Sequence, residues 1–275
     1  MDANAFDKAS RFKALHQGAG TFVIPNPWDA GSARVLAGLG FAALATSSAA
    51  CAMSSHGRHD GNITRDEALA HARAIAVATD LPVSADLENG FGDDPATAAE
   101  TIRLAAEAGL VGGSIEDATG DSQHPIYAFD LAVEPVAAAA RAAHGLPFAF
   151  TLTARAENFV RGIKDLDDTI RRLQAYERAG ADVLFAPGLP DLDAVRAVCA
   201  AVTKPVNFMV GIKGKSFSVA ELQDAGVRRI SLATSLHSAA MTALIDAARE
   251  VREHGSFGYL DRNASAKILG GFMRD

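Results

Sequence analysis

The sequence predicts an α/β protein, a (β/α)8 barrel of the TIM type with extra C-terminal helices. Short runs rich in Val, Ile, Leu and Ala alternate with segments of helical periodicity, which is typical of βαβ units around a parallel sheet. Eight such runs occur in a chain of 275 residues, a length common for one closed barrel. No linker or low-complexity segment divides the chain. We therefore expect residues 1–275 to form one barrel domain, with residues 236–275 as a C-terminal helical extension.

Residues that favour helix starts mark several of the predicted helices. Asp29 is a candidate N-cap. Thr64 is followed three residues later by Glu67, the spacing of a capping box. Asp94 stands before Pro95, which suits the first helical turn. The predicted helices are Ala5–Gln17, Ala30–Gly38, one starting after Thr64, one from Asp94 to Gly109, Asp130–His144, Leu166–Ala179, Leu192–Val202 and Val219–Ala225.

The predicted strands lie between these helices and carry polar residues towards their C-terminal ends. A polar loop is expected over Met53–Ile63, before the helix that Thr64 starts. The strands are predicted within Thr21–Trp28, Phe41–Ser48, Val83–Gly92, Val111–Asp117, Pro147–Arg155, Asp182–Leu189, Pro205–Val210 and Arg229–Thr234.

The chain beyond the eighth strand is longer than a barrel requires. It predicts one long helix from Leu236, a break over Gly255–Gly258 and a second helix through Met273. Surplus apolar helix at a terminus usually packs on a neighbouring surface. The extension therefore indicates contact with another subunit.

Composition excludes several classes of partner. The net charge is −7, the isoelectric point is about 5.6, and no basic or acidic run occurs. Nucleic acid and anionic membranes are therefore not expected partners, whereas a small molecule is. Cys51 and Cys199 lie far apart and in no metal-ligand spacing, so neither a disulfide framework nor a zinc site is predicted. No apolar run approaches membrane-spanning length, and we expect a cytoplasmic protein.

Two carboxylates lie at the C-terminal end of the strand that begins at Val83. Asp86 and Glu88 are two residues apart, a spacing that places strand side chains on one face. Adjacent carboxylates favour a hard cation such as Mg²⁺, Mn²⁺ or Ca²⁺. The alternative is a solvated strand end, but the apolar run before them and the glycines after them favour a site.

The C-terminal ends of barrel strands meet at one face, which is the active face of such barrels. Four carboxylates there would repel one another without a cation, so we expect a divalent ion held partly through water. Arg155 offers a planar donor fork for an anionic group, and the alternative is an ion pair with Glu157 or Glu116. The residues expected at this face are Ser47, Ser48, Asp60, Asp86, Glu88, Glu116, Arg155 and Asn207.

Three motifs together resemble the isocitrate lyase/phosphoenolpyruvate mutase superfamily. They are DLENGFG at 86–92, SIED at 114–117 and PNPWD at 25–29, and the resemblance extends over nearly the whole chain. It implies Mg²⁺-dependent chemistry, with Mn²⁺ as a substitute, at C–C or P–C bonds next to a 2-oxo or 2-hydroxy carboxylate. It also implies a homotetramer in which C-terminal helices are exchanged between partners.

The resemblance assigns roles to individual residues. Asp86 is the expected direct metal ligand, and the other metal positions act largely through water. The implied metal positions are Asp60, Asp86, Glu88 and Glu116; the candidate substrate-binding positions are Trp28, Ser47, Ser48, Ala49, Arg155 and Asn207; the candidate catalytic residues are Arg155, Glu116 and, for its own proton-transfer chemistry and not for the resemblance, His124.

The segment 118–125 departs from the pattern of this superfamily. Lyases of the isocitrate type carry a Lys-Lys/Arg-Cys-Gly-His segment here, and phosphonate enzymes carry a lysine and an asparagine. This chain has Ala-Thr-Gly-Asp-Ser-Gln-His-Pro instead. Chemistry that relies on the metal alone, such as decarboxylation of a 2-oxo diacid through a metal-stabilised enolate, is therefore favoured. The candidate proton donors are Asp121, Ser122, His124, Tyr127 or a bound water.

Three functions follow as hypotheses. The favoured one is a Mg²⁺-dependent lyase or decarboxylase that cleaves a C–C bond of a 2-oxo or 2-hydroxy diacid. The second is a phosphonopyruvate-type P–C hydrolase or mutase. The third is a barrel that binds a 2-oxo acid without catalysis.

Overall fold

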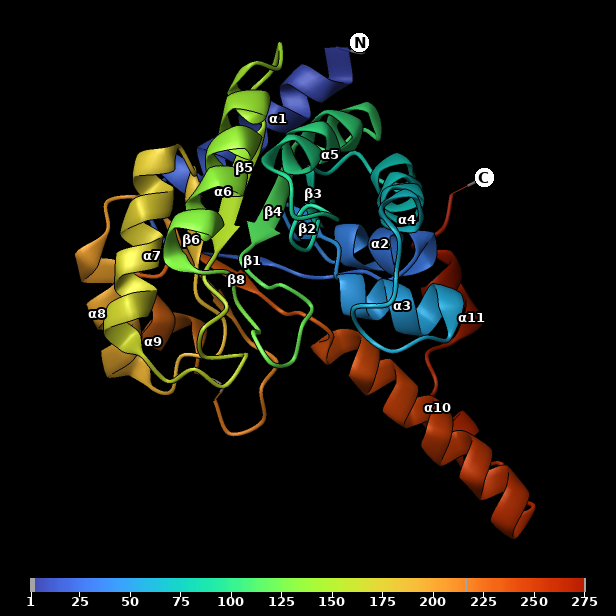
Figure 1. Ribbon diagram of the computed structural model, residues 1–275. Helices are drawn as coiled ribbons and strands as arrows, with labels where there is room; N and C mark the ends of the chain where they lie inside the picture. The colour runs from blue at the N-terminus through green and yellow to red at the C-terminus, as the bar shows by residue number, and fades with distance from the viewer. Residues whose placement is uncertain (1–2, 216, 275) are drawn as a thin grey trace.

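A closed ring of eight parallel strands forms the centre of the protein (Figure 1). The computed structural model describes residues 3–215 and 217–274. Within these residues the sheet order is β1-β8-β7-β6-β5-β4-β3-β2, and every ladder is parallel. The strands are β1 Phe22–Ile24, β2 Leu44–Ala45, β3 Val83–Asp86, β4 Gly112–Glu116, β5 Thr151–Arg155, β6 Val183–Phe185, β7 Val206–Met209 and β8 Arg229–Ser231.

Hydrogen bonds between the first two strand regions complete the ring. The backbone N–H of Ala45 donates to the carbonyl oxygen of Pro25 at 3.0 Å. The side-chain amide of Asn26 donates to the carbonyl oxygen of Thr46, also at 3.0 Å. The predicted eight-stranded α/β barrel is thereby confirmed, although most strands are shorter than the runs that predicted them.

The predicted capping residues begin their helices. The side chain of Asp29 accepts from the N–H of Ser32, Thr64 and Glu67 form the capping box, and Pro95 occupies the first turn after Asp94. The helices are α1 Ala3–Gln17, α2 Ala30–Gly38, α3 Ser48–His56, α4 Arg65–Ala78, α5 Pro95–Glu107, α6 Phe129–His144, α7 Leu166–Ala179, α8 Leu192–Ala201, α9 Val219–Asp224, α10 Ser235–His254, the 3-10 helix η1 Gly258–Arg262 and α11 Ala266–Gly270.

The loop predicted over Met53–Ile63 is partly wrong, because its first four residues belong to α3. Ser47 caps this helix by accepting a hydrogen bond from the N–H of Ala50, and Gly57 ends it in the left-handed conformation at φ 60°. The polar residues after Met53 hid the last turn. The residues between the strand predicted to end at Ser48 and the loop predicted to start at Met53 were assigned to no element. In the structure they form the first part of the nine-residue helix α3.

The barrel is closed at the end where its strands begin. Helix α1 lies there (Figure 1). The fully buried ring of Phe12 occupies the space beside Gly112. A Cβ added to Gly112 would lie 2.7 Å from this ring and 3.0 Å from the carbonyl oxygen of Thr151, so glycine is required at that position. The opposite end, where the strands stop, is left for the site.

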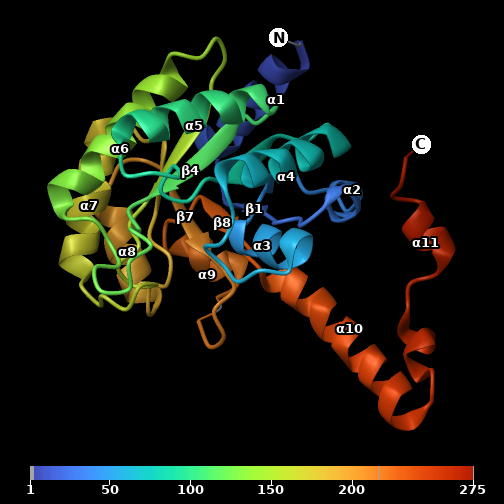
Figure 2. The same ribbon diagram turned by 45° about the vertical axis from the view of Figure 1, so that its right-hand side comes forward.

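The C-terminal extension leaves the barrel along α10 and turns back through η1 and α11 (Figure 2). The second predicted helix is wrong in length, because Ser265 starts a new helix of only five residues. Phe272 packs on Gly38 of α2, and Arg274 forms an ion pair with Asp80 at 3.1 Å. None of the helices among the described residues is both long and apolar enough to span a bilayer.

Candidate active site

A cavity of about 780 Å³ lies inside the barrel and opens beyond the C-terminal ends of the strands. Most residues that the sequence assigned to the site line this cavity, although they come from six different segments of the chain. They are Ser47, Ser48, Ala49, Asp60, Asp86, Glu88, Glu116, Arg155 and Asn207. The remaining two predicted residues, Trp28 and His124, are not among its lining residues.

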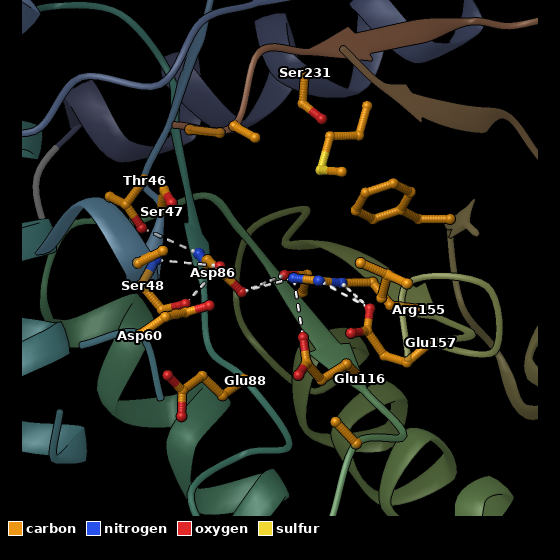
Figure 3. Close-up of a pocket in the computed structure, with 18 of the residues that line it drawn as sticks. Thr46, Ser47, Ser48, Asp60, Asp86, Glu88, Glu116, Arg155, Glu157 and Ser231 are labelled. Carbon is orange, nitrogen blue, oxygen red and sulfur yellow. Dashed lines mark hydrogen bonds and ion pairs between the residues drawn. The ribbon is translucent and has the colours of Figure 1, made fainter. Parts of the chain in front are cut away.

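Arg155 is the centre of the charged network in this cavity (Figure 3). Its Nη1 lies 3.0 Å from Asp86 Oδ1 and 3.0 Å from Glu116 Oε2, and its Nη2 lies 2.8 Å from Glu157 Oε1. The ring of Phe185 lies under the guanidinium, 5.1 Å from Cζ to the ring centroid. The ion-pair alternative is therefore present. Burial alone would lower the pKa of Arg155, but the three acids raise it, so the group stays a cation.

Glu116 and Glu157 share a second cation that the sequence analysis missed. Arg161 Nη2 lies 3.2 Å from Glu116 Oε1, and its Nε lies 3.2 Å from Glu157 Oε2. Arg161 follows Glu157 by four residues, and no periodic pattern there marked it as a site residue. Burial raises the pKa of Glu116 well above its ordinary value, and the two arginines oppose that shift.

Asp86 joins the third strand to the start of α3. The backbone N–H and the hydroxyl of Ser48 both donate to Asp86 Oδ2, at 3.2 and 3.0 Å. Ser47, Ser48 and Ala49 form the cap and first turn of α3, where backbone N–H groups point out of the helix end. Such an end favours anions, so an anionic substrate group can bind there.

Glu88 reaches the cavity for a reason other than the predicted one. Strand β3 ends at Asp86, and Glu88 has a φ of 48°, so alternation along a strand does not place its side chain. Its Oε1 is buried and has no hydrogen-bond partner among the described residues. Burial, and then the charges of Asp86 and Asp60, raise the pKa of Glu88 to about 7. The ionised form of Glu88 is therefore disfavoured at this position, and a bound cation would stabilise it.

The charges that line the cavity fit a divalent cation. Five acidic side chains and three arginines are present among its described lining residues, an excess of two negative charges when all five acids are ionised. No three His, Cys, Asp or Glu side chains of the described residues gather closely enough to enclose an ion alone. Mg²⁺ commonly binds through one or two carboxylates and keeps several waters, so the residues fit a largely hydrated ion.

Asp117 points away from the cavity, unlike its neighbour Glu116. It is 1% exposed and accepts from the N–H of Glu157 at 2.8 Å, from Arg172 Nη1 at 3.0 Å and from the hydroxyl of Tyr176 at 2.6 Å. Alternation along β4 explains why the two acids separate. Asp117 therefore fixes the segment that carries Glu157.

The floor of the cavity contains the buried side chain of Arg229. Its guanidinium donates from Nε to Asn207 Oδ1 at 2.8 Å and from Nη2 to Thr153 Oγ1 at 3.0 Å. Its Nη1 lies 3.4 Å from Nε2 of His16. Because Nδ1 of His16 lies 2.8 Å from the carbonyl oxygen of Phe12, the proton belongs on Nδ1 and Nε2 is an acceptor.

Acid should destabilise the protein through His16. Burial, and then Arg229, lower the pKa of His16 from 6.5 to about 3. A base with a lowered folded-state pKa contributes stability that is complete above pH 6.5 and is lost as the pH falls towards about 3, because the unfolded chain protonates first. We expect the free energy of unfolding to fall by up to about 1.4 kcal/mol per pH unit in this window, and His16→Gln to reduce that slope.

Denaturant unfolding of wild type and variant across this window measures the effect. The acids of the cavity titrate in both proteins, so the difference between the two slopes isolates His16. His254→Gln, at the exposed end of α10, is the matched control. Equal slopes for all three proteins would assign the acid sensitivity to other groups.

Comparison with known proteins gives this cavity a family context. The family model described as phosphoenolpyruvate phosphomutase matches residues 12–252. The chain belongs to the phosphoenolpyruvate mutase/isocitrate lyase superfamily. The match spans all eight strands and includes every predicted site residue. The resemblance inferred from the three motifs is thereby confirmed.

Individual members of the superfamily are similar over nearly the whole chain. A Burkholderia cenocepacia J2315 protein of known structure, assigned no further than lyase/mutase, is 53% identical with a TM-score of 0.96, covering 98% of this chain and 97% of its own. The structure of 2,3-dimethylmalate lyase is 27% identical with a TM-score of 0.86, covering 99% and 95%. Oxaloacetate decarboxylase from Bradyrhizobium diazoefficiens is 28% identical, covering 98% and 93%.

The loop in which this superfamily member departs from the lyase motif brings none of the candidate donors Asp121, Ser122, His124 and Tyr127 to the lining of the cavity. An antiparallel bridge between Ala118 and Ile126 closes it into a hairpin, and the His124 side chain is 84% exposed beside Asp121. The hydroxyl of Tyr127 bonds to Asn89 and Asp93. Of this loop, only residues 118–120 line the cavity.

The other predicted residue outside the cavity is Trp28. Its ring packs edge-to-face on His237, 5.5 Å between centroids, and its carbonyl oxygen lies 2.9 Å from Nε2 of His71. Neither cysteine substitutes for the missing thiol of the superfamily's lyase motif. Burial raises the pKa of Cys51 and of Cys199 to about 11, and neither lines the cavity.

Proposed function

We propose that this superfamily member is a divalent-metal-dependent carbon–carbon lyase that decarboxylates a 2-oxo diacid or cleaves a 2-hydroxy diacid. The observation that carries the proposal is the composition of the cavity. It combines five acidic side chains against three arginines and an unpartnered Glu88 oxygen with the absence of a thiol among its described lining residues. This set favours bond cleavage that depends on a cation and needs no cysteine.

The proposed metal positions are the carboxylates of the cavity mouth. Asp86 is proposed as the direct ligand, with Glu88, Glu116 and Asp60 acting largely through water. Mg²⁺ is the proposed ion, and Mn²⁺ has a compatible preference for oxygen ligands. A bound divalent cation would polarise the substrate carbonyl and stabilise the negative charge that develops as the C–C bond breaks.

The chain's own residues would orient the substrate. The first turn of α3, from Ser47 to Ala49, is proposed to hold one carboxylate with the backbone N–H of Ala49 and the hydroxyl of Ser47, because the N–H and the hydroxyl of Ser48 already donate to Asp86. Arg155 is held by three acids, and four of its five N–H groups already donate to them. The guanidinium is therefore in position before a ligand binds. The remaining N–H on Nη2 and the amide of Asn207 are proposed substrate contacts.

Protonation of the product carbon is proposed to come from water. In the described conformation His124 lies outside the cavity, and it contributes only if the loop of residues 118–127 closes over the opening. Decarboxylation suits this arrangement, because the carbanion it forms can take its proton from solvent. The similarity to oxaloacetate decarboxylase supports the same reaction.

A substrate panel tests the function. Purified protein with Mg²⁺ is incubated with oxaloacetate, methylisocitrate, dimethylmalate and phosphonopyruvate, and pyruvate and phosphate are measured. We expect pyruvate without phosphate from a 2-oxo or 2-hydroxy diacid, and its loss with a chelator. Phosphate release from phosphonopyruvate would identify a P–C hydrolase instead. Saturable binding of all four compounds without turnover would identify a non-catalytic barrel.

We also propose that the protein is a homotetramer whose C-terminal extension packs on a neighbouring subunit. Apolar side chains along α10 and α11 are exposed in the isolated chain; Leu244 and Ile268 are each 57% exposed. Burying such surface would stabilise an assembly. Exchange of the helices between partners is the proposed arrangement.

Removing residues 255–275 should lower the oligomeric mass and increase binding of an apolar dye. Light scattering after size exclusion measures the mass. The control is Ile268→Ala/Leu269→Ala in the full-length chain, which keeps the backbone but removes apolar area from α11. A truncated protein of wild-type mass and solubility would show that the extension serves only its own barrel.

A further inference from the structure

Arg229 is a buried cation without an acidic partner among the described residues. Its side chain is 6% exposed, and its hydrogen bonds go to Asn207, Thr153 and His16. The other buried arginines differ, because Arg155 contacts three carboxylates and Arg172 contacts Asp117 and Asp168. Burying a charge without a counter-charge is costly, so this arrangement requires a compensating benefit.

The groups around Arg229 hold its position without neutralising it. An amide oxygen, a hydroxyl and a neutral imidazole are its three acceptors. Burial lowers the pKa of Arg229 to about 9, which reflects the uncompensated charge. Three of the five N–H groups of the guanidinium are occupied, so two remain for another acceptor.

The barrel interior leaves a path from the opening to this guanidinium. Barrels of this type are usually filled by branched apolar side chains. Here the cavity that Asp86 and Arg155 line also reaches Arg229, because small residues face the interior between them. The small interior residues that line it include Ala45, Ser84, Ser114 and Ser231.

We propose that Arg229 is a specificity-determining residue that binds an anionic group of the ligand at the floor of the cavity. The site thereby selects a dianion with one anionic end at the mouth and the other directed towards β7 and β8. This inference rests on the proposed function for the identity of the ligand as a substrate. A carboxylate of the substrate and a small inorganic anion share the required chemistry, and the test separates them.

Succinate and its half-amide succinamate are matched probes, because they have nearly the same shape and differ by one charge. Their dissociation constants are measured by calorimetry with Mg²⁺ present, for wild type, Arg229→Gln and Arg229→Lys. We expect wild type to bind succinate about tenfold or more tightly than succinamate, the scale of a hydrogen bond to a charged group. Arg229→Gln should reduce the preference below about threefold, and Arg229→Lys should give an intermediate value.

An unchanged preference in Arg229→Gln, or no preference in wild type, would overturn the proposal. If Arg229→Gln does not fold, Arg229→Lys decides, because it keeps the charge but loses the planar fork. Repeating the wild-type titration in high chloride and in sulfate separates the two ligand sources. Chloride or sulfate that displaces succinate at a concentration below that of succinate itself, with succinamate binding unchanged, would show that the floor prefers an inorganic anion and would overturn the substrate assignment. Binding does not require turnover, so failure of the substrate panel leaves this result interpretable.

Discussion

Replacing Asp86 by asparagine should reduce kcat/KM by about a thousandfold or more, since a catalytic cation is worth several kcal/mol. The substitution keeps the size of the side chain but removes the charge at the proposed direct metal position. It also weakens the contacts of Asp86 with Ser48 and Arg155. Binding of Mg²⁺ should weaken in parallel, while the circular dichroism of the barrel stays unchanged, because Asp86 lies at the end of β3 and outside the apolar core.

Turnover of the diacid identified by the substrate panel and calorimetric titration of Mg²⁺ measure the two effects. Asp66→Asn is a matched control, because Asp66 is an exposed carboxylate in the first turn of α4. It loses the same charge at a residue that does not line the cavity. Wild-type turnover of Asp86→Asn in a buffer with chelator would refute the metal assignment.

Arg155→Met should inactivate the protein and lower its free energy of unfolding by about 3–5 kcal/mol, the scale for removing one partner of a buried ion pair. Asp86, Glu116 and Glu157 would lose their shared cation, and only Arg161 would remain near two of them. Added Mg²⁺ should recover part of the lost stability, because a bound cation reduces the repulsion among the carboxylates. Added Mg²⁺ should raise the free energy of unfolding of the wild-type protein by a smaller amount.

Denaturant unfolding with and without Mg²⁺ tests this expectation. Arg155→Lys keeps the charge without the planar fork, so its free energy of unfolding should lie between those of wild type and Arg155→Met. Arg161→Met is the second control, because that side chain is 41% exposed and its pairs are therefore weaker. If Arg155→Met were as stable as Arg161→Met, the network would not depend on Arg155.

The candidate site was predictable to the extent that local patterns determine it. Strand ends and the rule for the active face of a barrel identified Asp86, Glu116 and Arg155 as neighbours. In the structure Nη1 of Arg155 lies 3.0 Å from a carboxylate oxygen of each acid. The reasoning for Glu88 was wrong even though its position was right. Backbone in the left-handed region, not strand alternation, turns that residue into the cavity.

Residues without periodic context were harder to place. Arg161 lies in an irregular segment between β5 and α7, where no repeat indicates which way a side chain points. His124 carries suitable chemistry for proton transfer, but a hairpin bond pattern holds it outside the cavity. Chemistry of a residue type alone does not fix its position.

The sequence by itself determined the alternation of strands and helices, the helix caps and the acidic residues at the strand ends, because these depend on contacts within a few residues. Only the tertiary structure decided which charges are compensated. Arg229 obtains its three neutral partners from α1, β5 and β7, and the most distant of them, His16, is separated from it by 213 residues. Periodicity specifies which face of an element is buried, whereas the closure of the barrel specifies what that face meets.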